Sequence, residues 1–332
     1  MTLFVVFTAG SQNLDNENLN VKFLRYPTDP LPEDIKTYTK DIQLSSLDAD
    51  QDRASIESSM SSSLTLPGYE LVDGDADLKL RLWVGSYYVT DINSHVEDKE
   101  TKDKDGKVTR WKEYHYTFSY KYPVKLTITN TVTDEVLFDD YVNGSQDYTA
   151  GKSTASRDVE YARKSRDKAI SESKSGILSN CFSSVDSYIK KKYGYTPTSD
   201  YVRIKRVKKY KKFSYDKIDQ GVDILKAQLE TLEPVEGYAT EEFKAKVMEA
   251  VKLFDEELTE YDPYYKKARV NEKVASALYN NLALCFYWIN DFDKALEAVT
   301  TADGLKGDGW TNTVLSEIQD KKQRYEANGL IN

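Results

Sequence analysis

The sequence predicts an α+β protein, in which an N-terminal antiparallel sheet with a covering helix is followed by an all-α stack of helical hairpins. Residues 78–84 and 114–128 alternate apolar and polar side chains with a period of two, which is typical of half-buried strands. Residues 157–193, and the chain from about residue 214 onward, repeat apolar side chains every three or four positions, which is typical of helices.

The sheet domain is predicted to span residues 12–212. Its strands and helices are expected at residues 21–26, 36–44, 50–64, 78–84, 114–128, 136–142, 157–193 and 201–207. The long strand over 114–128 places aromatic and aliphatic side chains on its even positions. Pro123, on the other face, predicts an edge or a bulge at that point. The helix over 157–193 has one apolar face, so we expect it to lie across the sheet.

A long hairpin is predicted between the strands of this domain. Residues 98–110 are dense in charges of both signs and carry Asp105-Gly106 at the middle, which predicts an exposed tip. A tight turn there sets residue 95 opposite 116 and residue 96 opposite 115. His95 and His115, the two histidines of the chain, then point to opposite sides, and we predict exposed histidines and no metal site. A one-residue change in the loop would bring them together, which leaves a weak metal contact open.

The second domain, residues 213–332, is predicted to be entirely helical. Apolar residues recur at spacings of three and four in three stripes: Ile218, Val222, Leu225, Leu229, Leu232; Phe243, Val247, Val251, Phe254, Leu258, Tyr261; and Val314, Leu315, Ile318, Tyr325. Each stripe needs a neighbouring helix to cover it, which predicts a stack of hairpins. An ordinary helical bundle is the alternative.

Residues 277–306 carry the most specific spacing in the chain. Large, small and aromatic residues stand at the following places: Tyr279, Leu282, Ala283, Phe286, Ala295, Val299 and Ala302. This spacing resembles the tetratricopeptide (TPR) repeat, a helical hairpin closed around small residues, with Asn290-Asp291 as its turn and Asp291 or Asp293 as the cap. Gly307 stands at the usual closing proline, and Ala283 at the usual glycine. The resemblance implies a TPR-like, protein-binding stack over 214–332 and no chemistry.

Composition and charge restrict the class of partner. The net charge of −9 argues against nucleic acid, and the 25 tyrosines suit half-buried sheets or interaction surfaces. The densest basic run comprises Arg203, Lys205, Arg206, Lys208, Lys209, Lys211 and Lys212. A solvated edge strand, or a complement to acidic residues of the helices, is the preferred interpretation. Contact with an anionic envelope component through Arg203–Lys212 is the alternative.

The N-terminal segment predicts secretion. Residues 1–11 read as the remnant of a secretory signal cleaved before Gln12, because Leu3–Phe7 is apolar and Ala9 and Ser11 are small. No segment is long enough to span a bilayer. Cys181 and Cys285 are expected to be free, buried thiols in separate domains. A periplasmic or cell-envelope location follows, and the order of elements in the sheet domain is loosely similar to domains of bacterial envelope assembly factors.

No catalytic site is predicted. Ala150–Thr154 lacks the first glycine of a phosphate loop, because Gln146 stands there, and Ser171 with Lys174 lacks the companion motifs of the penicillin-binding and β-lactamase families. No nucleophile, base and orienting group can be assembled, so neither an enzyme nor a cofactor is expected.

Two non-enzymatic functions remain. The first is a protein-binding adaptor of the bacterial cell envelope, with Tyr279, Asn280 and Trp288 in the groove of the helical stack. The second is a carbohydrate- or peptidoglycan-binding module that uses Trp83, Trp111 and exposed tyrosines of the sheet domain. The adaptor needs an open groove on the helices, whereas the carbohydrate binder needs aromatic side chains on the outer face of the sheet.

Overall fold

The computed structural model divides the chain into two compact units, which are described separately. It describes residues 13–44, 57–58, 60–62, 64–85, 88–121, 123–142, 145–164, 166–209, 213–306 and 311–331. Unit 2 (residues 31–194) is an insertion in unit 1, which is built from residues 1–30 and 195–332. The α+β class is as predicted. The division at residues 212 and 213 is wrong, because strands from the two segments of unit 1, residues 14–25 and 196–207, pair with each other.

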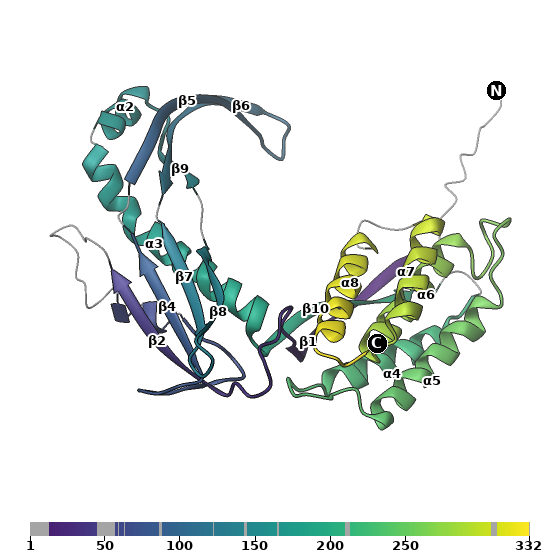
Figure 1. Cartoon of the computed structure of the whole chain (residues 1–332). Helices are drawn as coiled ribbons and strands as arrows, with labels where there is room; N and C mark the ends of the chain where they lie inside the picture. The colour runs from purple at the N-terminus through teal and green to yellow at the C-terminus, as the bar shows by residue number, and fades with distance from the viewer. Residues whose placement is uncertain are drawn as a thin grey trace. The chain divides into compact units, whose positions relative to one another are not determined.

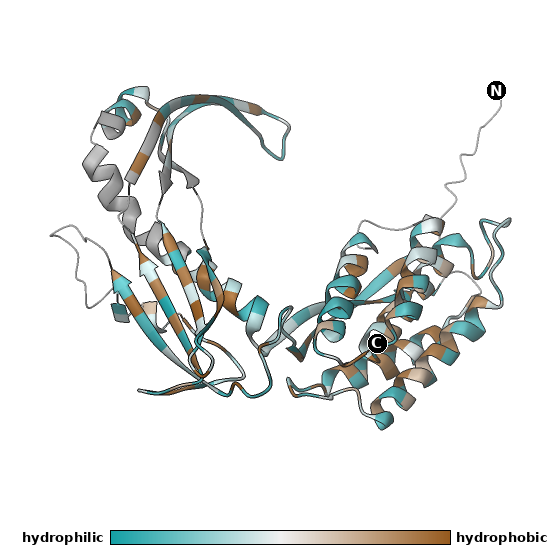
Figure 2. Cartoon of the chain, in the orientation of Figure 1, coloured by the Kyte–Doolittle hydropathy of each residue, from teal (hydrophilic) through white to brown (hydrophobic). Residues whose placement is uncertain are grey.

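Unit 2 contains a five-stranded sheet. Its strands are, in spatial order, β3 (Glu70–Leu71), β2 (Thr37–Leu44), β4 (Leu78–Val84), β7 (Val124–Asn130) and β8 (Glu135–Tyr141). β2 runs parallel to β3 and β4, and the other pairs are antiparallel. Apolar and polar positions alternate along β4 and β7 (Figure 2), so that one face is apolar.

The helix α3 (Arg166–Tyr193) covers the apolar face, as predicted (Figure 1). Phe182, Val185 and Ile189 of α3 share one core with the buried residues of β4 and β7. The predicted helix over 50–64 lies largely outside the described residues. Of its positions, Met60 and Leu64 are buried in the same core. The opposite face of the sheet therefore remains turned to solvent.

A three-stranded sheet extends unit 2. It consists of β5 (Tyr88–Lys102), β6 (Val108–Lys121) and β9 (Ser145–Ser153), with the short helix α2 (Ser156–Lys164) packed beside it. β5 and β6 form the long hairpin that was predicted, with a charged tip (Figure 1). The single strand predicted over 114–128 is wrong. β6 ends at residue 121 and β7, in the other sheet, begins after Pro123, which has no N–H for a continuous ladder.

The register of the hairpin also differs from the prediction. Gly106 takes a φ of 83°, and the backbone N–H of Asp103 donates to the carbonyl of Lys107, so that the turn is longer than two residues. Lys102 therefore pairs with Val108, and His95 pairs with His115 and not with residue 116. The two histidines lie on the same face of the ribbon, because residues directly opposite each other project to one side.

Unit 1 combines a two-stranded ribbon with a stack of helices. The β1–β10 ribbon pairs β1 (Leu14–Arg25) with β10 (Thr196–Val207) in antiparallel register. The helices are α4 (Asp216–Glu230), α5 (Glu241–Leu258), α6 (Glu272–Trp288), α7 (Phe292–Lys306) and α8 (Thr311–Ala327). α4 packs against α5, α6 against α7, and α7 against α8, which gives the predicted stack of hairpins.

The α6–α7 hairpin places its residues as the spacing indicates. The small residues Ala283, Ala295 and Ala302 are fully buried between the helices, with Leu282 and Val299 beside them. Asn290 takes a φ of 65° in the turn. The cap is Asp291, whose carboxylate accepts from the backbone N–H of Lys294 at 3.3 Å. Cys285 is a free, buried thiol, as expected, whereas the side chain of Cys181 lies outside the described residues.

Gly221 allows α4 and α5 to approach closely, and Gly221→Ala should destabilise unit 1. A Cβ at this position would lie 2.6 Å from a ring carbon of Phe254, which is fully buried. The overlap should lower the free energy of unfolding by about 1–3 kcal/mol, which exceeds the ~1 kcal/mol that alanine gains as a helix former. Urea denaturation measures the change. Gly304→Ala in α7, where a Cβ meets nothing within 4 Å, is the control and should stabilise the helix.

Candidate functional site

The predicted partner residues of the helical stack do not line an open groove. Trp288 is fully buried, and Asn280 is 3% exposed. Tyr279 is partly buried and packs against the core. The expectation that Asn280 and Trp288 present their side chains to a partner is therefore wrong, because both point into unit 1.

The β1–β10 ribbon accounts for the burial of Trp288. It packs against α4 and α6, the first helices of the two hairpins, and its inward side chains join the helical core. Phe23 of β1 meets the ring of Trp288 edge-on, with centroids 5.5 Å apart. The Asn281 amide accepts from the N–H of Lys205 at 2.8 Å and donates to its carbonyl at 2.9 Å. The protein's own strands thus occupy the face that the TPR resemblance assigned to a partner.

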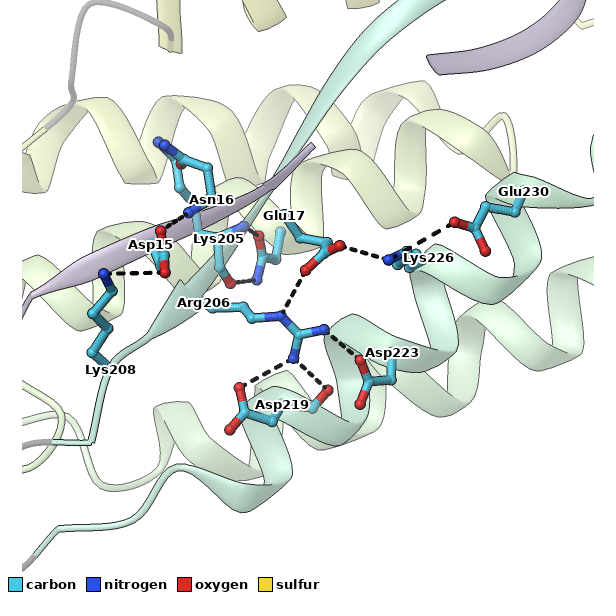
Figure 3. A network of polar contacts seen from close by, with 11 residues as sticks. Asp15, Asn16, Glu17, Lys205, Arg206, Lys208, Asp219, Asp223, Lys226 and Glu230 are labelled. Atoms are coloured by element: carbon cyan, nitrogen blue, oxygen red, sulfur yellow. Dashed lines mark hydrogen bonds and ion pairs between the residues drawn. The ribbon is translucent and has the colours of Figure 1, made fainter. Parts of the chain in front are cut away.

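Two residues of the basic run, Arg206 and Lys208, form ion pairs within unit 1. Arg206 is bonded to the carboxylates of Glu17, Asp219 and Asp223 (Figure 3). Lys208 lies 3.2 Å from Asp15, across the ribbon. The interpretation as a complement to acidic residues of the helices fits Arg206, since Asp219 and Asp223 belong to α4. Lys211 and Lys212 lie outside the described residues, so contact with an anionic component stays a prediction for that end.

Lys321 of α8 is the most unusual ionisable residue of unit 1. It is 5% exposed, and its Nζ donates to the carbonyl of Tyr287 at 3.1 Å and to the hydroxyl of Tyr238. Five rings surround the nitrogen at 4.2–5.7 Å: Tyr238, Tyr287, Trp288, Phe292 and Tyr325. The adjoining cavity measures about 30 Å³, which is room for one water molecule.

The native protein should lose unfolding free energy as the pH falls from about 10.5 toward neutrality, and Lys321→Met should not show this loss. The variant should therefore become more stable relative to the native protein as the pH falls. Burial lowers the pKa of Lys321 well below its ordinary value of 10.5. The unfolded chain therefore binds a proton in this range that the folded chain does not, and protonation favours unfolding of the native protein. Methionine is of similar length and does not titrate.

Urea denaturation at several pH values between about 7 and 10.5 measures this difference. Lys322→Met is the control, because hydrogen bonding to Asp293 raises the pKa of Lys322 and the sign of the linkage is reversed. A stability difference between native protein and Lys321→Met that stays constant over this pH range would contradict the lowered pKa.

The outer face of the five-stranded sheet is the candidate binding surface of unit 2. Strand pairing arranges its side chains in three rows: Gln43, Trp83, Lys125 and Tyr141; Asp41, Arg81, Thr127 and Asp139; and Thr39, Lys79, Thr129 and Val136. All are exposed or half-exposed. We call these twelve residues the outer face. It combines planar polar groups and hydroxyls with two aromatic rings.

The two aromatic rings of the outer face form a fixed corner. The rings of Trp83 and Tyr141 meet edge-on, with centroids 6.5 Å apart and planes at 76°. The Trp83 ring lies over Gly85, where a Cβ would come within 2.7 Å of it. Tyr141 is 55% exposed. Because Gly85 leaves space for the indole, Trp83 is held as a half-exposed platform on the sheet.

The charges of the outer face are paired with one another. Asp41 lies 3.0 Å from Arg81 and 3.3 Å from Lys79. Asp139 bonds Lys125 at 2.9 Å and the hydroxyl of Thr127 at 2.7 Å. Hydrogen bonding to these partners lowers the pKa of Asp139. The surface thus offers donors and acceptors with little net charge, which suits a neutral, hydroxyl-rich ligand better than a polyion.

A hollow adjoins one end of the outer face. It measures about 510 Å³ and is lined by Thr39, Lys79, the loop of residues 74–77, Thr131 and Val132. Asp77 fixes the loop, because its carboxylate accepts from the backbone N–H groups of Lys36 and Thr37 at 2.8 Å. From Lys79 to Trp83 the strand rises by about 13 Å, so the hollow and the aromatic corner are within reach of one extended ligand.

Comparisons with known proteins identify no family. Neither a family model nor a curated protein matches the chain. Among solved structures, it is similar to the PelC dodecamer from Paraburkholderia phytofirmans (12% identity, TM-score 0.24, 52% of this chain and 98% of that one). It is also similar to a putative neuraminyllactose-binding hemagglutinin homolog from Helicobacter pylori (13%, 0.27, 50% and 89%). A minor lipoprotein from Acinetobacter baumannii matches at 13% and 0.18, over 48% and 90%. Such TM-scores carry no functional argument.

Two searches of the described residues are negative. No helix among them is long and apolar enough to cross a membrane. No three or more His, Cys, Asp or Glu side chains in the described part of the chain are grouped as a metal site. Sequence reasoning named Trp83 and an aromatic outer face of the sheet, but not the residues beside Trp83, because the pairing of β2 with β4 and of β4 with β7 joins strands that are distant in sequence.

Proposed function

We propose that the protein is a non-enzymatic carbohydrate-binding protein of the bacterial cell envelope, and that the outer face of the five-stranded sheet is its binding surface. The observation that supports this most is the row of Gln43, Trp83, Lys125 and Tyr141, in which an aromatic corner stands among planar polar side chains. Aromatic rings stack on the apolar faces of sugars, and amide and carboxylate groups bond their hydroxyls. The envelope location rests on residues 1–11, outside the described residues.

Trp83→Ala should weaken binding to soluble peptidoglycan fragments or to a glycan array by about tenfold, equivalent to ~1.4 kcal/mol, because the stacking platform is lost. Calorimetry on the full chain measures the affinity. Trp111→Ala is the matched control, since Trp111 is 38% exposed but lies on the β5–β6 hairpin. Loss of binding in Trp111→Ala but not in Trp83→Ala would move the site to the hairpin. Absence of glycan binding by the native chain would exclude the function.

The protein-binding adaptor is the second candidate, supported by a different surface. In the loop between α5 and α6, Tyr264 and Tyr265 are 95% and 57% exposed. The loop is ordered by Asp262, whose carboxylate accepts from both of their backbone N–H groups. Fixed, exposed tyrosines are frequent anchors in protein interfaces. A partner captured by the native chain and lost with Tyr264→Ala/Tyr265→Ala would favour the adaptor.

A further inference from the structure

His95 and His115 face each other on the β5–β6 hairpin. They are directly opposite in the register of the two strands, and their rings are stacked with centroids 5.1 Å apart and planes at 20°. Both side chains project from the same face of the ribbon. The hairpin therefore holds two imidazoles side by side, on backbone that is fixed by strand pairing.

The surroundings of the pair leave nitrogen atoms for a ligand. His115 is 7% exposed, and its Nδ1 has no hydrogen-bond partner among the described residues. His95 is exposed, and its Nε2 lies 2.8 Å from the hydroxyl of Thr117. A buried ring nitrogen without a partner is costly, so an additional group at this position would lower the free energy of the folded state.

A carboxylate stands next to the pair. Glu97 occupies the same face as His95, two residues along β5, and its Oε1 is 3.8 Å from Nε2 of His115. Lys99 is bonded to Glu97, and Lys152 of β9 is close enough to act on it, so that these cations lower the pKa of Glu97. The site is thus two histidines with one ionised carboxylate at its edge, and water would complete the coordination.

We propose that His95 and His115 bind one divalent transition-metal ion, of the Zn²⁺, Ni²⁺ or Cu²⁺ class. Imidazole nitrogen is a preferred ligand of these ions, and a cross-strand pair presents two such nitrogens within the span of one ion after rotation of the exposed His95 ring. The ion joins β5 to β6 midway along the long hairpin and resists separation of its strands.

Titration of the full-length, tag-free chain with Zn²⁺ alone tests the site. Because the chain contains two histidines, the imidazole region of its proton NMR spectrum reports on these two rings. Both sets of signals should shift together and saturate at one equivalent. Calorimetry should give the same stoichiometry, and Zn²⁺ should raise the melting temperature. Absence of any shift, or a shift of the His95 signals alone, would overturn the proposal.

His95→Ala is the decisive variant, because His95 is exposed and its loss leaves the core intact, whereas His115→Ala removes a buried ring. It should weaken Zn²⁺ binding by at least about tenfold and abolish the shift of the His115 signals. Ser94→Ala, the neighbouring residue on the other face of β5, is the matched control and should bind as the native chain does. Equal affinity of His95→Ala and the native chain would place the ion elsewhere and reject the site.

Discussion

Trp288→Ala is expected to lower the free energy of unfolding of unit 1 by about 3–5 kcal/mol, the range for removal of a large buried aromatic residue. The indole is fully buried and meets the rings of Phe23, Tyr238 and Tyr287 edge-on. Phe23 comes from β1, so the variant also loosens the ribbon from α6. The cavity cannot close by a small shift, because its walls come from a strand and a helix that are held by other contacts.

Urea denaturation followed by circular dichroism measures the loss. Trp288→Phe should lose less, since a smaller ring remains and the indole N–H, which has no partner among the described residues, is removed. Tyr264→Ala, at a residue that is 95% exposed, should change stability by less than about 0.5 kcal/mol. A similarly small change for Trp288→Ala would mean that Trp288 is at the surface, available to a partner.

Asn281→Leu, the second large effect, should lower the free energy of unfolding of unit 1 by about 2–6 kcal/mol. The Asn281 amide is fully buried and satisfies both backbone groups of Lys205, as a paired strand would do. Leucine has a similar volume but leaves a buried N–H and a buried carbonyl without partners, at ~1–3 kcal/mol each. Since this contact fastens β10 to α6, backbone amides of the ribbon should also exchange faster with solvent in the variant.

Asn280→Leu provides the matched comparison for this prediction. Asn280 is the adjacent residue on α6 and is also buried, but its amide donates within the helix, to the carbonyl of Ser276 at 3.1 Å. That carbonyl keeps its bond in the helix ladder, so the loss should be smaller than for Asn281→Leu, and exchange in the ribbon should be unchanged. Equal losses would show that any polar residue at this depth is required, irrespective of the ribbon.

Much of the secondary structure follows from local patterns in the sequence. The period of two in residues 78–84 and the stripes of α4, α5 and α8 gave strands and helices where the structure has them. Such patterns record which face of an element is buried. They do not record the element that buries it, and for this reason β1 and β10 were assigned to the sheet domain although their apolar side chains pack against helices.

The candidate binding sites were predicted less well than the secondary structure, because they depend on which elements pack together. Trp288 stands where a helical repeat turns side chains toward its groove, and the sequence does not reveal that the chain's own ribbon fills that face. Asn280 is also buried, with its amide bonded within α6. The opposite placing of the histidines followed from an assumed two-residue turn, and a one-residue difference in a turn reverses every side chain of a strand. The outer face depends on the pairing of strands that are distant in sequence, which local periodicity does not specify.

The insertion of unit 2 between β1 and β10 determines the order in which a nascent chain can mature. β1 leaves the ribosome first, but its partner strand and all helices of unit 1 follow residues 31–194. Unit 2 can therefore complete its fold while β1 is still without its ladder. Arg25 pairs with Thr196, so the inserted segment must return to its starting point. A unit that has already folded makes this closure less costly in entropy than an open loop of the same length. Damage to the core of unit 2 should thus delay the maturation of unit 1, to which it contributes no strand.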